Sequence, residues 1–329
     1  MLNSGTPIYR VLMIGCGNIA GEFDALRPGN LPPLSHAGAY IKHGGFNIDA
    51  CMDPNVNKLN NFAKRWNVKI AAQDFEELNT SPGDFDVISI CSPTSLHEIH
   101  IREALRLNPR LIFCEKPLTS NVESSIRILD ECKKKGVALV VNYSRNWDSL
   151  LVNLIQDLKA GRWGKIRSVV GNYNKGILNN GGHMIDLLLR ILGPLDVVAT
   201  AGVTYDFWPD DPTIGVLFSA ISGLVPVYMS PADARDYSYF ELELVCELGV
   251  IRMESGGLGW RIREVIPSSQ FNGYKELGMA QNIGGGYLDS MTSAVDNIYQ
   301  YLYEGTPIRC SGEDALQVQR ICHQIKTMT

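Results

Sequence analysis

The sequence predicts an α/β protein in which a doubly wound parallel sheet is followed by a second domain with a mostly antiparallel sheet. Three observations predict this architecture. Strand and helix patterns alternate from residue 9 to about residue 142. A glycine-rich turn, Gly15-Cys-Gly-Asn-Ile-Ala-Gly21, directly follows the first strand pattern. After about residue 145, strand patterns follow one another in series, which is typical of antiparallel sheets.

The first domain is expected to be built on buried parallel strands. Runs such as Val87-Ile-Ser-Ile-Cys91 lack a polar face, as strands covered on both sides do. The expected strands are Arg10–Ile14, Phe46–Met52, Val87–Cys91, Leu111–Cys114 and Ala138–Asn142. Helices are expected between them. One should begin with a capping box of Ser120 and Glu123 and end at Gly136, after three lysines.

The second domain is expected to open with a helix that Asp148 caps and that stops at Gly161. Apolar and other residues then alternate through Tyr239–Cys246, which indicates a half-buried strand. Ser222-Gly223 and Leu248-Gly249 are interpreted as hairpin turns. Two helices are expected to close the chain, near Leu288–Tyr303 and Gly312–Ile325.

Composition indicates a water-soluble globular protein of about two domains. The 329 residues are 45% apolar and 20% charged, with a net charge of −5. Neither a basic block for nucleic acid nor an apolar run of membrane-spanning length is evident. Without a C-x-x-C pair, the cysteines are expected to be buried free thiols in a reducing cytoplasm rather than disulfides or a metal site. They are Cys16, Cys51, Cys91, Cys114, Cys132, Cys246, Cys310 and Cys322.

The glycine turn predicts a dinucleotide site of the Rossmann type. Glycines at 15 and 17, between a strand and a helix, let backbone amides approach a pyrophosphate without Cβ atoms in the way. Asn18 and Ile19 lie within the same turn and are expected to contact the cofactor. The alternative is an ordinary turn from strand to helix, since this motif alone is weak evidence.

Asp53 ends the second expected strand and favours NAD over NADP. A carboxylate there accepts hydrogen bonds from the adenosine ribose and repels a 2′-phosphate. The following residues, Pro54-Asn-Val-Asn57, supply no arginine for that phosphate. The spacing from Gly21 to Asp53 is longer than usual because of a loop, Ala25–Leu34, after which Ser35 is expected to cap a helix starting at His36. This loop is either a tolerated surface insertion or a lid near the cofactor or substrate.

Two further segments follow expected strands at the edge where doubly wound sheets bind ligands. The first is Ser92-Pro-Thr-Ser-Leu-His97, in which Ser92, Pro93, Thr94 and His97 are candidate cofactor contacts. His97 is equally well interpreted as a packing or capping histidine. The second is Cys114-Glu-Lys-Pro117, which puts Lys116 where such a domain holds the reactive ring of its cofactor. Partial desolvation beside the cationic ring would lower the pKa of this lysine and suit it to proton transfer.

Taken together, these segments resemble the Gfo/Idh/MocA oxidoreductase family nearly end to end. The resemblance rests on the glycine turn, Asp53, Pro93-x-x-x-His97, Glu115-Lys116-Pro117, Arg145 and the stretch Asn179-Asn-Gly-Gly-His-Met-Ile-Asp186. It implies an NAD(P)-binding Rossmann domain at residues 1–143. It also implies an α/β domain at residues 144–329 with a large open sheet, which binds substrate and forms homodimers or homotetramers. The last helix is expected to pack back on the first domain.

The resemblance implies that Lys116 hydrogen-bonds the reacting oxygen and that His183 exchanges the proton or positions the substrate. Glu115 is expected to pair with a cofactor ribose or a nearby base. Where the family usually has Asp-x-Gly-x-His-x-x-Asp, this sequence has Asn179 first, and an amide cannot relay a proton. Read without the family, His183 is also compatible with a helix cap or a core position, and Lys116 with a surface site.

Several polar residues are candidates for a polyol pocket, and two aromatic residues are candidates for packing on a sugar face. The polar candidates are Tyr143, Arg145, Asn172, Asn174, Lys175, Asn179 and Asn180, and the aromatic ones are Tyr173 and Trp147. The activity expected is hydride transfer between NAD and a secondary alcohol or ketone of a sugar, cyclitol or nucleotide-linked sugar. The alternatives are glycoside cleavage through transient oxidation and a non-catalytic NAD-binding regulator. No metal site is expected.

Overall fold

The computed structural model describes residues 5–220, 223–233 and 235–329. Internal contacts divide the chain into two compact units. The first contains residues up to Trp147 together with Leu288–Gln317, and the second contains Asp148–Tyr287 and Val318–Thr329. The sequence-based boundary at 143/144 lies close to Trp147, and the functions expected of the two parts stay predictions.

The first unit contains a parallel sheet with the strand order β3-β2-β1-β4-β5-β6, which is the doubly wound order of dinucleotide-binding domains. Each neighbouring pair is parallel, so the predicted fold class is confirmed. The strands are β1 (Tyr9–Ile14), β2 (Phe46–Met52), β3 (Ile70–Ala72), β4 (Val87–Ile90), β5 (Leu111–Cys114) and β6 (Ala138–Val141). Sequence analysis missed β3, a three-residue edge strand that buries only Ala72.

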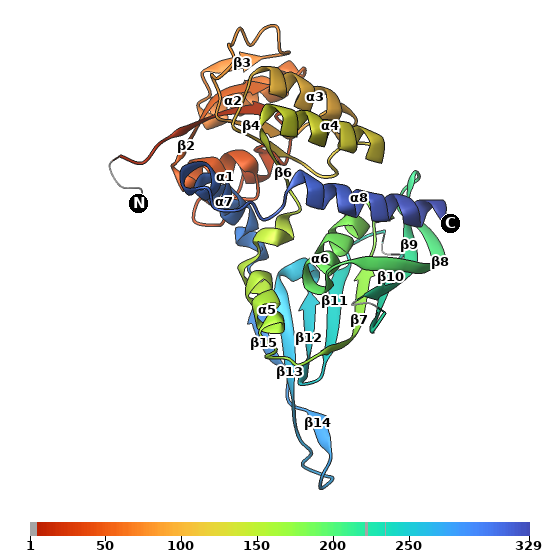
Figure 1. Cartoon of the computed structure of the whole chain (residues 1–329). Helices are drawn as coiled ribbons and strands as arrows, with labels where there is room; N and C mark the ends of the chain where they lie inside the picture. The colour runs from red at the N-terminus through yellow and green to blue at the C-terminus, as the bar shows by residue number, and fades with distance from the viewer. Residues whose placement is uncertain (1–4, 221–222, 234) are drawn as a thin grey trace. The chain divides into compact units, whose positions relative to one another are not determined.

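Helices cover this sheet (Figure 1). They are α1 (His36–His43), α2 (Val56–Trp66), α3 (Thr94–Arg106), α4 (Val122–Lys135) and α7 (Ser290–Glu304). Ser35 caps α1 by accepting a hydrogen bond from Gly38 N, as predicted. The capping box predicted for α4 is wrong, because Asn121 is the cap and accepts from Ser124 N at 2.8 Å. Gly136, in the left-handed conformation, ends α4 as expected.

The glycine turn does not run directly into a long helix. One helical turn and a short 3₁₀ segment, η1 (Glu22–Asp24), are followed by the predicted loop. Helix α1 then continues the helical turn that precedes the loop. His36 N donates to Ile19 O at 3.0 Å and Ala37 N donates to Ala20 O at 2.9 Å, so backbone hydrogen bonds cross the loop. The Asp24 carboxylate accepts from Leu34 N and Ser35 N at 2.9 and 3.0 Å, which closes the base of the loop.

The second unit contains a mostly antiparallel sheet, as predicted. Its strand order is β14-β13-β12-β11-β7-β10-β9-β8, with β15 paired to β13. Only β7 and β10 are parallel among the paired strands that the structure describes in this unit. The strands are β7 (Ile166–Tyr173), β8 (Leu195–Trp208), β9 (Asp211–Ala220), β10 (Val225–Pro231), β11 (Phe240–Cys246), β12 (Gly249–Glu254), β13 (Gly259–Pro267), β14 (Lys275–Leu277) and β15 (Gln281–Gly284).

Helical segments of the second unit include α5 (Ser149–Lys159), a π-helical turn η3 (Gly176–Gly181) and α6 (Gly182–Leu192). Asp148 caps α5 as predicted. The last helix, α8 (Gly312–Thr327), begins among residues of the first unit and ends among those of the second. The turn predicted at Leu248-Gly249 joins β11 to its antiparallel neighbour β12. Ser222 of the other predicted turn lies outside the described residues.

All eight cysteines are free thiols, and every one except Cys91 is buried, as predicted. Within the described residues, no group of three or more His, Cys, Asp or Glu side chains could hold a metal ion. A search of the same residues finds no helix long and apolar enough to cross a membrane.

We expect Asp24→Ala to destabilise the first unit by about 1–3 kcal/mol, because two backbone N–H groups and the Ser35 hydroxyl lose a charged acceptor. Asp130→Ala is the matched control, since its carboxylate makes an exposed pair with Lys134 that is worth less than about 1 kcal/mol. Urea unfolding of both variants tests this difference. Equal urea midpoints for the two variants would show that Asp24 does not stabilise the junction between the loop and α1.

Candidate functional site

Most residues that the sequence predicts to bind the cofactor lie at one edge of the first sheet. The strands are parallel, so the segments that follow them leave from the same edge. These segments are the glycine turn after β1, Asp53 after β2, Ser92 after β4, Glu115 and Lys116 after β5, and Asn142 after β6. The structure therefore brings the predicted cofactor-binding segments of this unit together.

Gly15 and Gly17 are required for different reasons. Gly15 has φ +90°, and a Cβ added to it would lie 2.8 Å from Cys91 C and Ser92 N. Its absence of a side chain therefore lets the turn after β1 pack on the loop after β4. Gly17 has no positive φ, and a Cβ there would meet no atom within 4 Å. The chain itself gives no reason for glycine at 17, whereas a pyrophosphate lying on the turn would.

Asp53 joins the ends of β1 and β2. Its side chain is 9% exposed, and its two oxygens accept from Cys16 N and Asn55 N, each at 2.8 Å. A carboxylate oxygen has two lone pairs, so each oxygen can still accept one ribose hydroxyl. The backbone bonds thus hold the negative charge in place beside the glycine turn.

The Ser92–His97 segment is held by two histidines, of which His97 is buried and His100 is half-buried. His97 is 1% exposed, and its Nε2 and Nδ1 atoms lie 2.9 Å from Ser92 O and Pro117 O. Its ring therefore joins the loop after β4 to the segment after β5, as expected of a packing histidine, and a direct cofactor contact by His97 stays a prediction. His100 Nδ1 lies 2.8 Å from Ser92 Oγ. Thr94 begins α3, and Pro93 precedes it as the cap residue.

The Glu115 carboxylate makes two side-chain hydrogen bonds within the candidate site. Its Oε1 lies 2.9 Å from Nε2 of His36 and accepts from Asn142 Nδ2 at 2.7 Å. Burial by itself would raise the pKa of Glu115. The hydrogen bond and charge of His36, the amide of Asn142 and the charge of Lys116 outweigh it, so the pKa lies below its ordinary value. An ionised carboxylate therefore lies next to Lys116 in the chain, and it pairs with a nearby base as expected.

Lys116 is half-buried and is joined to Pro117 by a cis peptide bond. Downstream, Tyr143 and Arg145 are 1% and 7% exposed, and Trp147 is fully buried. Trp147 Nε1 donates to Asn297 Oδ1 at 3.1 Å. Trp147 is therefore a core residue, and the expectation that it packs on a sugar face is wrong. Substrate contacts by Tyr143 and Arg145 stay predictions.

A cavity of about 910 Å³ lies between the glycine turn and α2. Its lining includes Asn18, Gly21 and Ala25 from the turn and the start of the loop, together with Lys64 and Arg65 from α2. Arg65 Nη1 donates to Ala25 O at 2.8 Å and ties the loop to that helix. The beginning of the loop thus lies beside the glycine turn, and its role as a lid stays a prediction.

In the second unit, the predicted residues Lys175, Asn179, Asn180 and His183 follow one another along η3 and the first turn of α6, all half-buried. Sequence analysis missed the acids that hold this segment. Asp211 accepts from Leu178 N and Asn179 N at 2.8 and 3.0 Å. Wide helical turns of this kind are frequent at functional sites.

Asp206 holds the start of the same segment. It accepts from Lys175 N at 2.7 Å, and Lys175 has the left-handed φ of 61°. The ammonium of Lys175 lies 5.0 Å from the centre of the Phe207 ring. The only sequence signal for these acids is their position in Asp206-Phe-Trp-Pro-Asp-Asp-Pro-Thr213, which has the composition of a turn.

Two candidate residues, Tyr173 at the end of β7 and Asn174 directly after it, have structural roles. Tyr173 is fully buried, and its hydroxyl donates to Ile214 O at 2.6 Å, so the expectation that it packs on a sugar face is wrong. Asn174 is also fully buried. It donates to Tyr237 O and accepts from Tyr239 N, at 2.8 and 3.0 Å, so its amide ties β7 to the segment before β11. Asn172 is half-buried.

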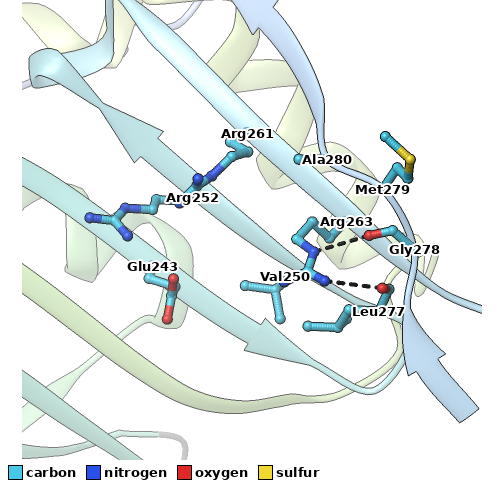
Figure 2. Close-up of a pocket in the computed structure, with 9 residues that line it drawn as sticks. All are labelled: Glu243, Val250, Arg252, Arg261, Arg263, Leu277, Gly278, Met279 and Ala280. Atoms are coloured by element: carbon cyan, nitrogen blue, oxygen red, sulfur yellow. Dashed lines mark hydrogen bonds between the residues drawn. The ribbon is translucent and has the colours of Figure 1, made fainter.

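Another cavity, of about 460 Å³, lies on the sheet of the second unit (Figure 2). Arg263 donates to the backbone oxygens of Gly278 and Leu277, each at 3.0 Å. Arg252 pairs with Glu241, and Arg261 pairs with Glu254 at 3.3 Å. These arginines are balanced by acids and carbonyls, and no residue predicted from the sequence to bind cofactor or substrate lines the cavity.

Comparisons with known proteins agree with this fold. The model of the oxidoreductase family with an NAD-binding Rossmann fold, GFO_IDH_MocA, matches residues 9–143. The uncharacterised oxidoreductase YrbE of Bacillus subtilis (strain 168) is 27% identical over 185 residues, or 56% of this chain and 46% of the relative. Inositol 2-dehydrogenase of Rhizobium meliloti (strain 1021) is 24% identical over 258 residues, or 71% and 75%.

The chain spans less than half of the length of the first curated relatives that it matches, at 46% and 42%. Among solved structures, a super-repressor mutant of Gal80p from Saccharomyces cerevisiae has a TM-score of 0.79 at 14% identity, covering 98% of this chain and 96% of that one. Such a likeness shows the fold alone. The family model covers residues 9–143, which include the sheet edge described above, and together with the inositol dehydrogenase it supports a Gfo/Idh/MocA oxidoreductase.

Proposed function

We propose that this protein is an NAD-dependent oxidoreductase that transfers a hydride between nicotinamide and a secondary alcohol or ketone of a sugar, cyclitol or nucleotide-linked sugar. The observation that supports the proposal most is the occurrence of Gly17 and Lys116 at the same edge of the sheet. The first leaves open space on the turn after β1, and the second follows β5 at the same edge of the sheet. One accommodates a dinucleotide, and the other supplies a proton-transfer group.

The residues present fit an NAD molecule. The backbone of Gly15–Ile19 would hold the pyrophosphate, and the fixed Asp53 carboxylate would accept from the adenosine ribose. When bound, NAD accepts or supplies the hydride. The remaining task is to move a proton to or from the reacting oxygen, and we assign it to the Nζ atom of Lys116. Burial beside a cationic ring favours the neutral amine, while the ionised Glu115 favours the ammonium, so the two effects oppose each other.

We assign the substrate end of the reaction to the second unit. His183 can exchange a proton or orient the substrate. Asn179 accepts and donates hydrogen bonds but cannot carry the proton, so it is assigned to binding a hydroxyl. Lys175 and Asn180 lie on the same segment and are candidate contacts for further hydroxyl groups. Inositol 2-dehydrogenase of Rhizobium meliloti, a relative, supports a polyol as the class of substrate.

A non-catalytic NAD-binding regulator is the alternative that one observation favours. Asn179 stands where the family usually has an acid. A regulator would bind NAD without turning it over. Absorbance in the NADH band, followed with a panel of inositols, glucosides and nucleotide sugars, separates the two functions.

We expect Gly17→Ala to weaken NAD binding by at least about tenfold without changing thermal stability, because the added methyl group occupies space that only the cofactor uses. Gly15→Ala is the matched control, and it should lower the melting temperature because its Cβ would clash with backbone atoms 2.8 Å away. Calorimetric titration and thermal unfolding measure both effects. Unchanged NAD affinity in Gly17→Ala would contradict the placement of the pyrophosphate.

The wild-type protein should bind NAD at least several-fold tighter than NADP, because the Asp53 charge repels a 2′-phosphate. Competitive calorimetry measures the ratio. Asp53→Asn should narrow the ratio, but its NH₂ group cannot accept one of the two backbone bonds, so its melting temperature must be recorded alongside. Equal affinities of the wild-type protein for both cofactors would refute the assignment.

Lys116→Ala should lower turnover by at least about 100-fold, the usual cost of losing an acid–base group, while NAD binding survives. His183→Ala should also be severely impaired, and Asn179→Ala should mainly raise KM. Lys133→Ala, in the exposed last turn of α4, is the control and should be normal. Near-normal turnover in Lys116→Ala would overturn the mechanism. Loss of turnover with unchanged KM in Asn179→Ala would show that the proton path is incomplete.

A further inference from the structure

A chain of buried polar groups ends on the carboxylate next to Lys116. His36 is fully buried at the start of α1, and its ring packs on Phe113 with centroids 4.3 Å apart. Its Nε2 lies 2.9 Å from Glu115 Oε1 and its Nδ1 lies 3.4 Å from Ser89 Oγ. Ser89 Oγ in turn lies 2.8 Å from the hydroxyl of Tyr40. This chain lies within the first unit.

The donor in the contact between His36 and Glu115 can be assigned from the chemistry of the two groups. Glu115 is ionised and can only accept, so His36 Nε2 carries a hydrogen and donates it. On the other side of the ring, His36 Nδ1 contacts Ser89 Oγ, which in turn contacts the hydroxyl of Tyr40. Burial raises the pKa of Tyr40, which keeps the phenol protonated. The chain therefore ends with a donor, His36 Nε2–H, on the Glu115 carboxylate, and connected hydrogen bonds of this kind polarise one another.

The hydrogen bonds that cross the loop place His36 at this position. The hydrogen bond from His36 N to Ile19 O continues the first helical turn after β1, so His36 has the backbone place that an uninterrupted helix would give it. Asp24 fixes the preceding residue, Ser35, through its N–H. The inserted segment between these points leaves the helix register intact.

We propose that His36 is a positioning residue for the reaction: its Nε2–H bond, together with that of Asn142, holds the Glu115 carboxylate in one orientation, and this carboxylate, next to Lys116 in the chain, positions that lysine. The inference rests on the proposed role of Lys116. His36 does not touch the reacting atoms, and it acts through Glu115.

The charged and titratable groups that act on Glu115 come from α1, from the end of β5 and from the residue after β4. They are His36 on α1, Lys116, and the thiols of Cys91 and Cys114. Burial raises the pKa of both thiols, so they stay neutral at physiological pH. Loss of His36 therefore removes a principal contribution that lowers the pKa of Glu115, and the remaining effect of burial raises it.

The test compares His36→Gln with His36→Leu in the full-length chain. The Gln amide nitrogen can replace Nε2–H as a donor, whereas Leu has similar bulk and no donor. With the substrate identified by the NADH assay, His36→Leu should lose at least about tenfold in kcat with KM and NAD affinity within about threefold. His36→Gln should stay within about threefold of wild type. If His36→Leu does not fold, His36→Phe keeps a ring against Phe113 and serves as the apolar variant.

A second measurement needs no activity. Titration of the Glu115 carboxyl by ¹³C NMR in the apo protein should show its pKa raised by at least about one unit in the apolar variant and little changed in His36→Gln. Equal kcat in the Gln and apolar variants, or an unchanged Glu115 pKa in the apolar variant, would overturn the proposal. A wild-type protein that is inactive on every substrate would count against the proposed function, and the Glu115 titration would still decide the role of His36.

Discussion

The largely buried carboxylate of Glu115, with 14% of its side chain exposed, constrains much of the first unit. A buried ion costs several kcal/mol unless hydrogen bonds replace its hydration. Its partners come from distant parts of the chain, His36 at the start of α1 and Asn142 after β6. The end of β5 therefore has to meet both a helix start and another strand end. At the same edge, the close approach of Gly15 to the loop after β4 brings the ends of β1 and β4 together.

This constraint explains how an insertion is tolerated next to the cofactor turn. Lengthening a loop costs little conformational entropy. The larger loss of stability would come from breaking the helix that contains His36. The backbone hydrogen bonds to Ile19 O and Ala20 O avoid this loss, because they keep the helical hydrogen bonds across the loop. The Asp24 carboxylate closes the loop at its base, and Arg65 ties it to α2. The insertion thus adds surface beside the glycine turn while leaving the helix and its histidine in place.

Sequence patterns predicted the sheet of the first unit well, because buried parallel strands such as Val87–Ile90 are continuous apolar runs. The edge strand β3 was missed because it is short and mostly exposed. The cap of α4 was misplaced by one residue, since Ser120 and Asn121 are both good cap residues and only geometry separates them. The register of the helix across the loop could not be predicted, because it depends on hydrogen bonds between residues sixteen or more positions apart, as in His36 N to Ile19 O.

The candidate site was predictable where chemistry is local in the sequence and unpredictable where it depends on tertiary contacts. Glu115-Lys116-Pro117 and the glycine turn are contiguous motifs. His36, Asp206 and Asp211 carry no local signal, because what matters is which group they reach across the fold. Polar residues near a motif were also over-assigned to ligand binding. Asn174 has the right composition for a polyol pocket, yet both ends of its amide are used by the backbone near β11.

The second unit shows why an amide at position 179 is compatible with an ordered site. A carboxylate there would add a negative charge to a segment whose backbone already donates to Asp211 and whose first residue donates to Asp206. Like charges at such short range repel when they are partly buried. Asn179 avoids that repulsion, and an amide can both donate and accept hydrogen bonds. An amide at position 179 is therefore compatible with the acids that order the turn, and the proposed mechanism assigns proton transfer to Lys116 and His183 instead.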